Sequence, residues 1–278
     1  MKLSESPYKT LGPKTARLFT TLHEQNRLVF DLKTAADAMQ TDHVHATSIL
    51  HAAIKRGLVT PIKRGLYNLV PFEMGAVTSH LQDRYEIIAT SMGSIPYCFS
   101  YASALDLHRL VTQPVFDSYV STTRRTSTKR IAGTLVHFVT TPQDLFFGTE
   151  TVRIRDQFSV VVNDLERSLV DGLVNPAYCN GFMEVAKAFF MAKSRLDLTK
   201  LISYSKKIRR DSVIRRLGFI LETLQLAPSQ ILDELARSLP TGTTVLDPTL
   251  PVVNASRSSK WGLRLAVTAD EILKAVSN

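Results

Sequence analysis

Residues 42–70 read DHVHATSILHAAIKRGLVTPIKRGLYNLV, and this stretch decides how the first part of the chain is expected to fold. Thr41 or Asp42 can cap a helix, and Gly57 stands where such a helix would end. Two short apolar runs then flank the basic turn Lys63-Arg64-Gly65. This pattern predicts a helix followed by a β-hairpin with a positively charged tip.

Two more helices are expected before this stretch, over Lys14–Gln25 and Leu32–Met39, with a small strand at Leu28–Phe30 between them. A boundary is expected near Pro71–Gly75. Three helices followed by a hairpin with a basic tip is the order of a winged helix-turn-helix. We therefore expect residues 1–75 to form a DNA-binding domain of this type.

The third helix must dock on the first two with one face and offer polar side chains to DNA with the other. Docking is assigned to Val44, Leu50, Ala53, Ile54 and Leu58. Contacts to base edges are expected from side chains near the helix start, which are His43, His45, Thr47, Ser48 and His51. Contacts to phosphates or the minor groove are expected from Lys55, Lys63 and Arg64. The start of the helix also suits a nearby phosphate.

The rest of the chain, residues 76–278, is expected to form a larger mixed domain, strand-containing first and mainly helical later, so that the fold class is α+β. The early helices are predicted at Val77–Met92 and Ser100–Leu110. The strands are predicted at Val115–Thr122, Thr134–Thr140, Thr151–Ile154 and Gln157–Val162. The later helices are predicted at Asn163–Val174, Phe182–Lys193, Leu196–Lys207, Asp211–Leu224 and Ser229–Ser238. Asn163, with Glu166 three residues on, fits a capping box.

Composition favours an anionic partner, nucleic acid before membrane. The 278 residues include 34 Lys and Arg against 25 Asp and Glu, which gives a formal net charge of +9. Neither a signal peptide nor a membrane-spanning run is expected, so the chain reads as cytoplasmic. Cys98 and Cys179 are interpreted as buried, reduced thiols.

A metal site and an enzymatic function are both disfavoured. His43, His45 and His51 have no carboxylate or thiol at ligand spacing, so neither a metal nor another cofactor is expected. Asp171, Glu184 and Lys187 are the nearest candidates for a metal nuclease. Glu184 and Lys187 are more naturally a surface ion pair, however, and Glu166, Arg167 and Asp171 fit a buried ion network. No nucleophile elbow or phosphate loop appears in the sequence.

Two further basic stretches can each be interpreted in two ways, as a solvated face or as a surface that binds nucleic acid. The first is a candidate secondary nucleic-acid surface formed by Arg124, Arg125, Lys129 and Arg130. The second consists of Lys206, Lys207, Arg209, Arg210, Arg215 and Arg216, where a helix would put Arg209 and Arg216 near one face. For this second stretch the solvated face is favoured.

Several short motifs, taken in order, resemble the abortive-infection type IV antitoxins, the AbiE antitoxin family. They are Gly57-Leu58-Val59 with Arg64-Gly65-Leu66-Tyr67, Tyr101–His108, Asp164–Leu173, Asn175–Tyr178 with Gly181 and Glu184, Arg215–Phe219 and Lys260–Arg264. Two positions depart from the pattern, because Arg109 and Asn180 stand where it has glycine.

The resemblance implies a transcriptional autorepressor that binds double-stranded DNA at inverted repeats in its own promoter. It also implies an antitoxin of a type IV toxin–antitoxin system, a form of phage defence, whose C-terminal domain counters a nucleotidyltransferase toxin without a stable complex. The alternative is a winged-helix regulator whose C-terminal domain binds a ligand or acts as a nuclease. A nucleotidyltransferase gene immediately downstream would favour the antitoxin.

Overall fold

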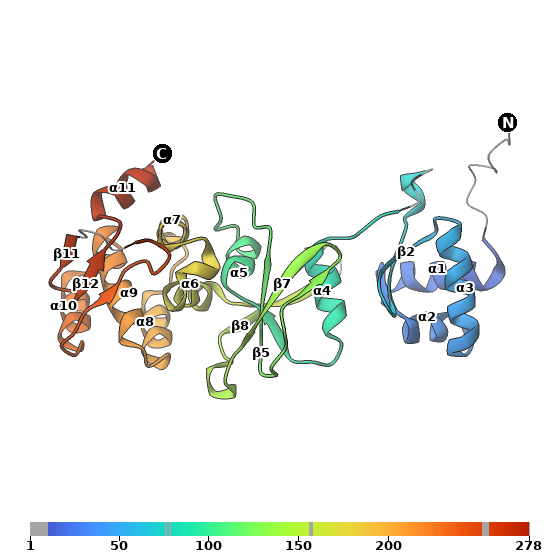
Figure 1. The fold of residues 1–278 in the computed structure, drawn as a ribbon, viewed down its shortest axis with the longest axis horizontal. Helices are drawn as coiled ribbons and strands as arrows, with labels where there is room; N and C mark the ends of the chain where they lie inside the picture. The colour runs from blue at the N-terminus through green and yellow to red at the C-terminus, as the bar shows by residue number, and fades with distance from the viewer. Residues whose placement is uncertain (1–10, 76, 78, 156–157, 252–255, 278) are drawn as a thin grey trace. The chain divides into compact units, whose positions relative to one another are not determined.

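The computed structural model describes residues 11–75, 77, 79–155, 158–251 and 256–277, and these residues form an α+β fold (Figure 1). Packing divides the chain into two compact units. The first unit takes residues 1–95 together with 129–135 and 153–160, and the second takes the remainder. The expected division into two domains, residues 1–75 and residues 76–278, stays a prediction.

The first unit begins with helices and a small antiparallel sheet. Its elements are α1 (Pro13–Glu24), β1 (Val29–Asp31), α2 (Leu32–Met39), α3 (His43–Lys55), β2 (Val59–Lys63), β3 (Leu66–Leu69), η1 (Phe72–Met74) and α4 (Arg84–Met92). β3 pairs antiparallel with both β1 and β2, so the strand order is β1-β3-β2. The predicted order of elements up to residue 70 therefore matches the structure.

Aspartate caps start two of these helices. Asp31 Oδ1 accepts a hydrogen bond of 2.7 Å from the backbone N–H of Thr34, at the start of α2. Asp42 Oδ1 accepts one of 2.9 Å from the backbone N–H of His45, at the start of α3. Each bond satisfies a backbone donor that the first helical turn leaves unpaired.

A shared apolar core holds α1, α2 and α3 against the sheet. Its fully buried members include Leu18, Leu22, Phe30, Leu50, Leu58 and Leu69. Leu50, Ala53 and Leu58 therefore dock as predicted. Val44 does not, because 79% of its surface is exposed; the buried positions of α3 are Ala46, Leu50 and Ala53.

The helix predicted from Val77 begins only at Arg84. The backbone N–H of His80 donates to Thr60 Oγ1 at 3.0 Å, and that of Gln82 donates to Asn68 Oδ1 at 3.2 Å. These amides are engaged by side chains of the β2–β3 hairpin, so the segment does not form helical hydrogen bonds. Periodicity alone does not reveal such long-range competition.

A six-stranded sheet has the order β6-β7-β5-β4-β9-β8. Its strands are β4 (Tyr97–Phe99), β5 (Ser118–Thr122), β6 (Lys129–Ile131), β7 (Thr134–Thr140), β8 (Thr149–Arg155) and β9 (Phe158–Asn163). β5 pairs antiparallel with β4 and parallel with β7, and β4 pairs parallel with β9. The three-residue strands β4 and β6 were not predicted, and Gln157 of the predicted fourth strand lies outside the described residues.

The helices from α5 onward belong to the second unit. They are α5 (Tyr101–Leu107), α6 (Leu165–Val174), α7 (Phe182–Ala192), α8 (Leu198–Lys207), α9 (Asp211–Thr223), α10 (Ser229–Arg237) and α11 (Ala269–Ser277), with short turns η2 (Gln143–Leu145) and η3 (Pro176–Cys179). A small sheet of order β10-β12-β11 comprises β10 (Thr244–Val245), β11 (Ser256–Ser258) and β12 (Leu263–Leu265). No helix in the described part of the chain is long and apolar enough to span a membrane.

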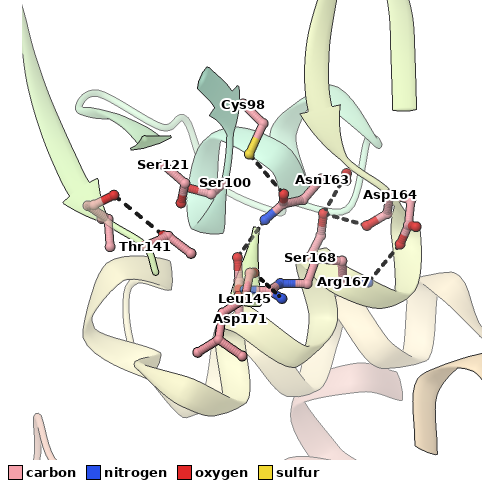
Figure 2. Close-up of polar contacts among 11 residues, drawn as sticks. Cys98, Ser100, Ser121, Thr141, Leu145, Asn163, Asp164, Arg167, Ser168 and Asp171 are labelled. Atoms are coloured by element: carbon pink, nitrogen blue, oxygen red, sulfur yellow. Dashed lines mark hydrogen bonds and ion pairs between the residues drawn. The ribbon is translucent and has the colours of Figure 1, made fainter. Parts of the chain in front are cut away.

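A buried polar network joins α6 to the six-stranded sheet (Figure 2). Asp171 Oδ1 accepts a bond of 3.0 Å from Arg167 Nε, and Asp171 Oδ2 accepts one of 2.6 Å from Asn163 Nδ2. Asn163 Oδ1 in turn accepts from the thiol of Cys98 in β4, at 3.0 Å. Burial raises the pKa of Asp171, and the Arg167 guanidinium and Asn163 amide oppose that shift. The ion network predicted for Glu166, Arg167 and Asp171 is confirmed for Arg167 and Asp171, whereas Glu166 pairs with Lys200.

The capping box predicted at Asn163 is wrong. Asp164 caps α6 instead, with its Oδ1 2.9 Å from the backbone nitrogen of Arg167. Glu166 accepts from the backbone N–H of Asp197 and from Lys200 Nζ, at 3.0 and 2.9 Å. The side chain of Asn163 belongs to the network at the end of β9, where burial favours a fully paired amide over a cap.

Two motifs that lie far apart in the sequence interlock in the second unit. A Cβ atom at Gly218, in α9, would overlap the six-membered ring of the buried Trp261. Trp261 Nε1 donates to Glu222 Oε2 at 2.6 Å, one turn further along α9. A Cβ at Gly262, which has a φ of +58°, would overlap the guanidinium of Arg215. The residues around 215–219 and 260–264 therefore fold as one unit.

Arg215 and Arg216 are buried, so neither a solvated face nor a nucleic-acid surface describes them. Arg216 donates to the carbonyl oxygens of Leu246, Leu173 and Val245 at 2.9, 2.7 and 3.0 Å. Burial lowers its pKa, with Asp247 opposing. Arg209 lies between α8 and α9 rather than on a helix, so it shares no helical face with Arg216.

Gly218→Ala should destabilise the second unit, because the added methyl cannot fit without displacing Trp261. Overpacking of a dense core costs about 1–3 kcal/mol or more, measurable by urea unfolding followed through far-UV circular dichroism, which serves for variants with and without Trp261. Ser212→Ala, at a partly exposed position of α9, should stay within about 0.5 kcal/mol. Combining Gly218→Ala with Trp261→Phe should cost less than the sum of the two single changes, and strict additivity would contradict this packing.

Candidate nucleic-acid interface

One face of α3 is open to solvent and carries the predicted base-contacting side chains. His43, His45, Ser48 and His51 are exposed, and so is Lys55 in the last turn. Val44, assigned above to the core, lies among them and adds an apolar surface near the start of the helix. The exposed face thus combines hydrogen-bonding groups with one large apolar side chain, two kinds of group that can contact base edges.

Thr47 differs from its neighbours on this face. It is half-buried, and its hydroxyl donates to the carbonyl oxygen of His43 at 2.7 Å. This back-bond occupies the only proton of the hydroxyl and leaves acceptor capacity alone. Ser48 is the more available hydroxyl on α3.

The start of α3 already carries an anion. Asp42 Oδ2 lies 2.6 Å from His45 Nδ1, in addition to the backbone cap. The hydrogen bonds from the His45 backbone and ring lower the pKa of Asp42 to about 2. A carboxylate fixed at this position takes the place that the sequence reasoning gave to a DNA phosphate and repels phosphates nearby.

The β2–β3 turn presents the predicted basic tip. Lys63 and Arg64 are exposed, and Gly65 has a φ of +77°, which a tight turn of this kind requires. Burial and the nearby ammonium of Lys129 lower the pKa of Lys63. Lys129, at the start of β6, thus lies close enough to the tip to add to its positive potential. The approach of Lys129 to Lys63 could not be predicted from residue spacing.

The remaining members of the first basic stretch are also exposed. Arg124 and Arg125 belong to the connection after β5 in the second unit, whereas Lys129 and Arg130 belong to the first unit. Arg130 Nη1 donates to the carbonyl of Gly133 at 2.7 Å, which orders the turn between β6 and β7. Within the first unit, Lys129 is the member brought near the candidate interface.

The residues considered for catalysis have structural partners. Lys187 Nζ lies 2.7 Å from Glu184 Oε1, as predicted for an ion pair, and Glu184 Oε2 accepts from Thr112 at 2.8 Å. Asp171 is engaged by Arg167 and Asn163. Both cysteines are free and buried, and burial raises their pKa values, that of Cys98 to about 12. Such thiols are poor nucleophiles.

The Asp42 carboxyl of the folded chain should titrate at about 2. Because the folded pKa lies below the ordinary value of about 3.9, its stabilisation is complete above that value and is lost as pH falls through about 2. Carboxyl-carbon NMR would follow the titration. His45→Ala should raise the midpoint only part of the way, since the backbone bond remains, and His51→Ala should leave it unchanged. A midpoint near 4 would mean that Asp42 does not cap α3.

Comparison with known proteins relates this chain to a solved structure by its fold. No protein-family model matches the chain, and no curated protein matches it. Among solved structures, the chain is similar to the crystal structure of the RV2827C protein from Mycobacterium tuberculosis, with a TM-score of 0.68 at 12% sequence identity. The match covers 98% of this chain and 97% of that one. At this identity the likeness shows a shared fold alone.

Proposed function

We propose that residues 11–70 form a winged helix-turn-helix and that the protein binds double-stranded DNA as a transcriptional regulator. The observation that carries this proposal is the exposed polar face of α3 in the same small domain as the basic β2–β3 tip. The strand order β1-β3-β2, with three helices packed on one core, supports it. In this arrangement α3 enters the major groove and the hairpin serves as the wing.

The side chains divide by the contacts they can make. Ser48, His43 and His51 present hydrogen-bonding groups that can distinguish base edges in the major groove. Lys63 and Arg64 contact phosphates or the minor groove from the wing, and Lys129 strengthens the same positive field. Asp42 disfavours a phosphate at the start of α3, which leaves phosphate binding mainly to the wing and to Lys55.

We further propose that the regulator is the autorepressing antitoxin of a type IV toxin–antitoxin pair and counters a nucleotidyltransferase toxin without a stable complex. The basis is the ordered set of family-like motifs. Two features support it. Arg109 and Asn180, which stand where the pattern has glycine, have φ values of 60° and 61°, the region that favours glycine. The motifs around Arg215 and Trp261 also interlock.

Replacing Lys63 and Arg64 by Ala should weaken promoter binding and flatten its salt dependence. Each lost phosphate contact reduces the slope of log K against log salt by about 0.9, so the double change should remove about one to two units. Adding Lys129→Ala should flatten it further. Fluorescence anisotropy across salt measures the slope. Lys274→Ala, which removes one positive charge from α11, is the control for the loss of a single charge. Unchanged affinity and slope would remove the wing from the interface.

Ser48→Ala should lower specific binding by about 1–3 kcal/mol and spare binding to random DNA, because a lost base contact affects only the specific complex. Thr47→Val should cost less, since the Thr47 hydroxyl already donates within the helix. Competition titrations with promoter and random duplexes measure both quantities. Equal losses on the two duplexes would count against base readout by Ser48.

Repression and toxin neutralisation should separate genetically. The Lys63→Ala, Arg64→Ala protein, expressed from an independent promoter, should still protect cells that express the toxin from the neighbouring gene, while a reporter of its own promoter is derepressed. Growth and reporter output are the two readouts. Loss of protection together with repression would mean that repression itself accounts for the antitoxin effect. Absence of a toxin gene beside this one would favour the regulator with a ligand-binding or nuclease domain.

A further inference from the structure

The second unit contains a cavity of about 220 Å³ between the start of α5, the turn after β7, α6 and the segment that leads into α9. Arg167, Asp171, Arg210 and Tyr101 all line it. Figure 2 shows Thr141, Leu145, Arg167 and Asp171, which lie along its walls. The cavity therefore adjoins the polar network of α6, and Tyr101 and Arg210, which do not belong to that network, also line it.

Tyr101 lies in the cavity wall with a strained backbone conformation. It follows β4 at the start of α5 with a φ of 50°, a conformation in which a bulky side chain is an outlier. Its ring is nine-tenths buried and packs edge-on against Tyr178 at 5.1 Å. Among the described residues, no group forms a hydrogen bond with its hydroxyl. The ring is buried, but the hydroxyl is not one of the fully enclosed unpaired atoms, so it stays accessible to a small molecule in the cavity that Tyr101 lines. Strained residues also gather at functional sites.

The charges around the cavity leave one cation in excess. Arg167 Nε pairs with Asp171, and Arg167 Nη1 donates to the carbonyl of Leu145 at 3.1 Å. Its Nη2 makes no hydrogen bond to the described residues, although Arg167 as a whole is nine-tenths buried. Arg210 is exposed at the cavity margin. With Asp171 balanced by Arg167, Arg210 supplies the net positive charge.

We propose that this cavity binds a small organic anion whose phosphate or carboxylate group lies between Arg167 and Arg210 and accepts a hydrogen bond from Tyr101. A guanidinium nitrogen with a free N–H and a phenol with a free proton suit an oxyanion, because both donate hydrogen bonds and an oxyanion offers only acceptor oxygens. The cavity volume limits the enclosed part of the ligand to a small molecule. This site is independent of the DNA-binding proposal, since all its residues lie in the second unit.

Thermal unfolding of the full chain, titrated with inorganic phosphate and separately with citrate at constant ionic strength, tests the proposal. A saturable rise in Tm is expected with at least one anion, and the stronger of the two identifies phosphate or carboxylate as the preferred group. Tyr101→Phe removes only the hydroxyl and should raise the apparent Kd about tenfold. Arg210→Gln, at an exposed position, should raise it about tenfold or more.

Three control variants locate the site. Tyr204→Phe removes a tyrosine hydroxyl that bonds Asp164 outside the cavity, and Arg209→Gln removes the neighbouring exposed cation. Arg257→Gln alters a different cavity of about 430 Å³. None of the three should change the apparent Kd. The proposal is overturned if neither anion gives a saturable rise, if a control weakens binding as much as Arg210→Gln, or if Arg210→Gln leaves it unchanged. Should Tyr101→Phe not fold, Arg210→Gln decides.

Discussion

The second unit depends on the hydrogen bonds that the buried carboxylate of Asp171 accepts. Asp171 is 2% exposed and accepts from Arg167 in its own helix and from Asn163 at the end of β9. Through Asn163 it reaches Cys98 in β4, and through Arg167 it reaches the turn at Leu145. Burying these charges costs desolvation, and losing one partner would leave the other buried and unpaired. The sheet, the helix and the turn are therefore fixed together.

A few of the cations of the chain are internal and join distant segments. Arg216 donates to three carbonyl oxygens and Arg215 to those of Trp261 and Pro240. Arg155 bonds Glu86, which is fully buried in the first unit. The formal charge of +9 is thus an indirect guide to the surface, because arginines that join segments contribute to it as fully as those that face solvent.

Sequence reasoning succeeded where structure is decided locally. The cap expected at Thr41 or Asp42, the glycine after α3 and the apolar spacing placed the elements of residues 13–69 to within one or two positions. It failed where distant groups compete. The hairpin side chains Thr60 and Asn68 engage the backbone before α4, and burial recruits Asn163 away from capping. It also missed β4 and α11, and it assigned Val44 to the core although the chain packs Ala46 there.

The residue types of the candidate interface could be predicted from the sequence, but the contacts among its side chains could not. The exposed positions on α3 follow from helical spacing once the buried face is known. The back-bond of Thr47, the contact of the Asp42 cap with the His45 ring and the approach of Lys129 to Lys63 are set by the three-dimensional fold. The strained backbone at Tyr101 is likewise invisible in the sequence, because nothing in residue type marks a tyrosine with positive φ.

The contact between Gly218 and Trp261 has an evolutionary consequence. The indole occupies the volume that any side chain at 218 would need, so neither position can vary freely while the other is kept. Homologues that enlarge residue 218 must shrink residue 261 in the same lineage, and the pair should covary despite a separation of more than forty residues. The last segment of the chain is thereby tied to α9 in evolutionary history as well as in space.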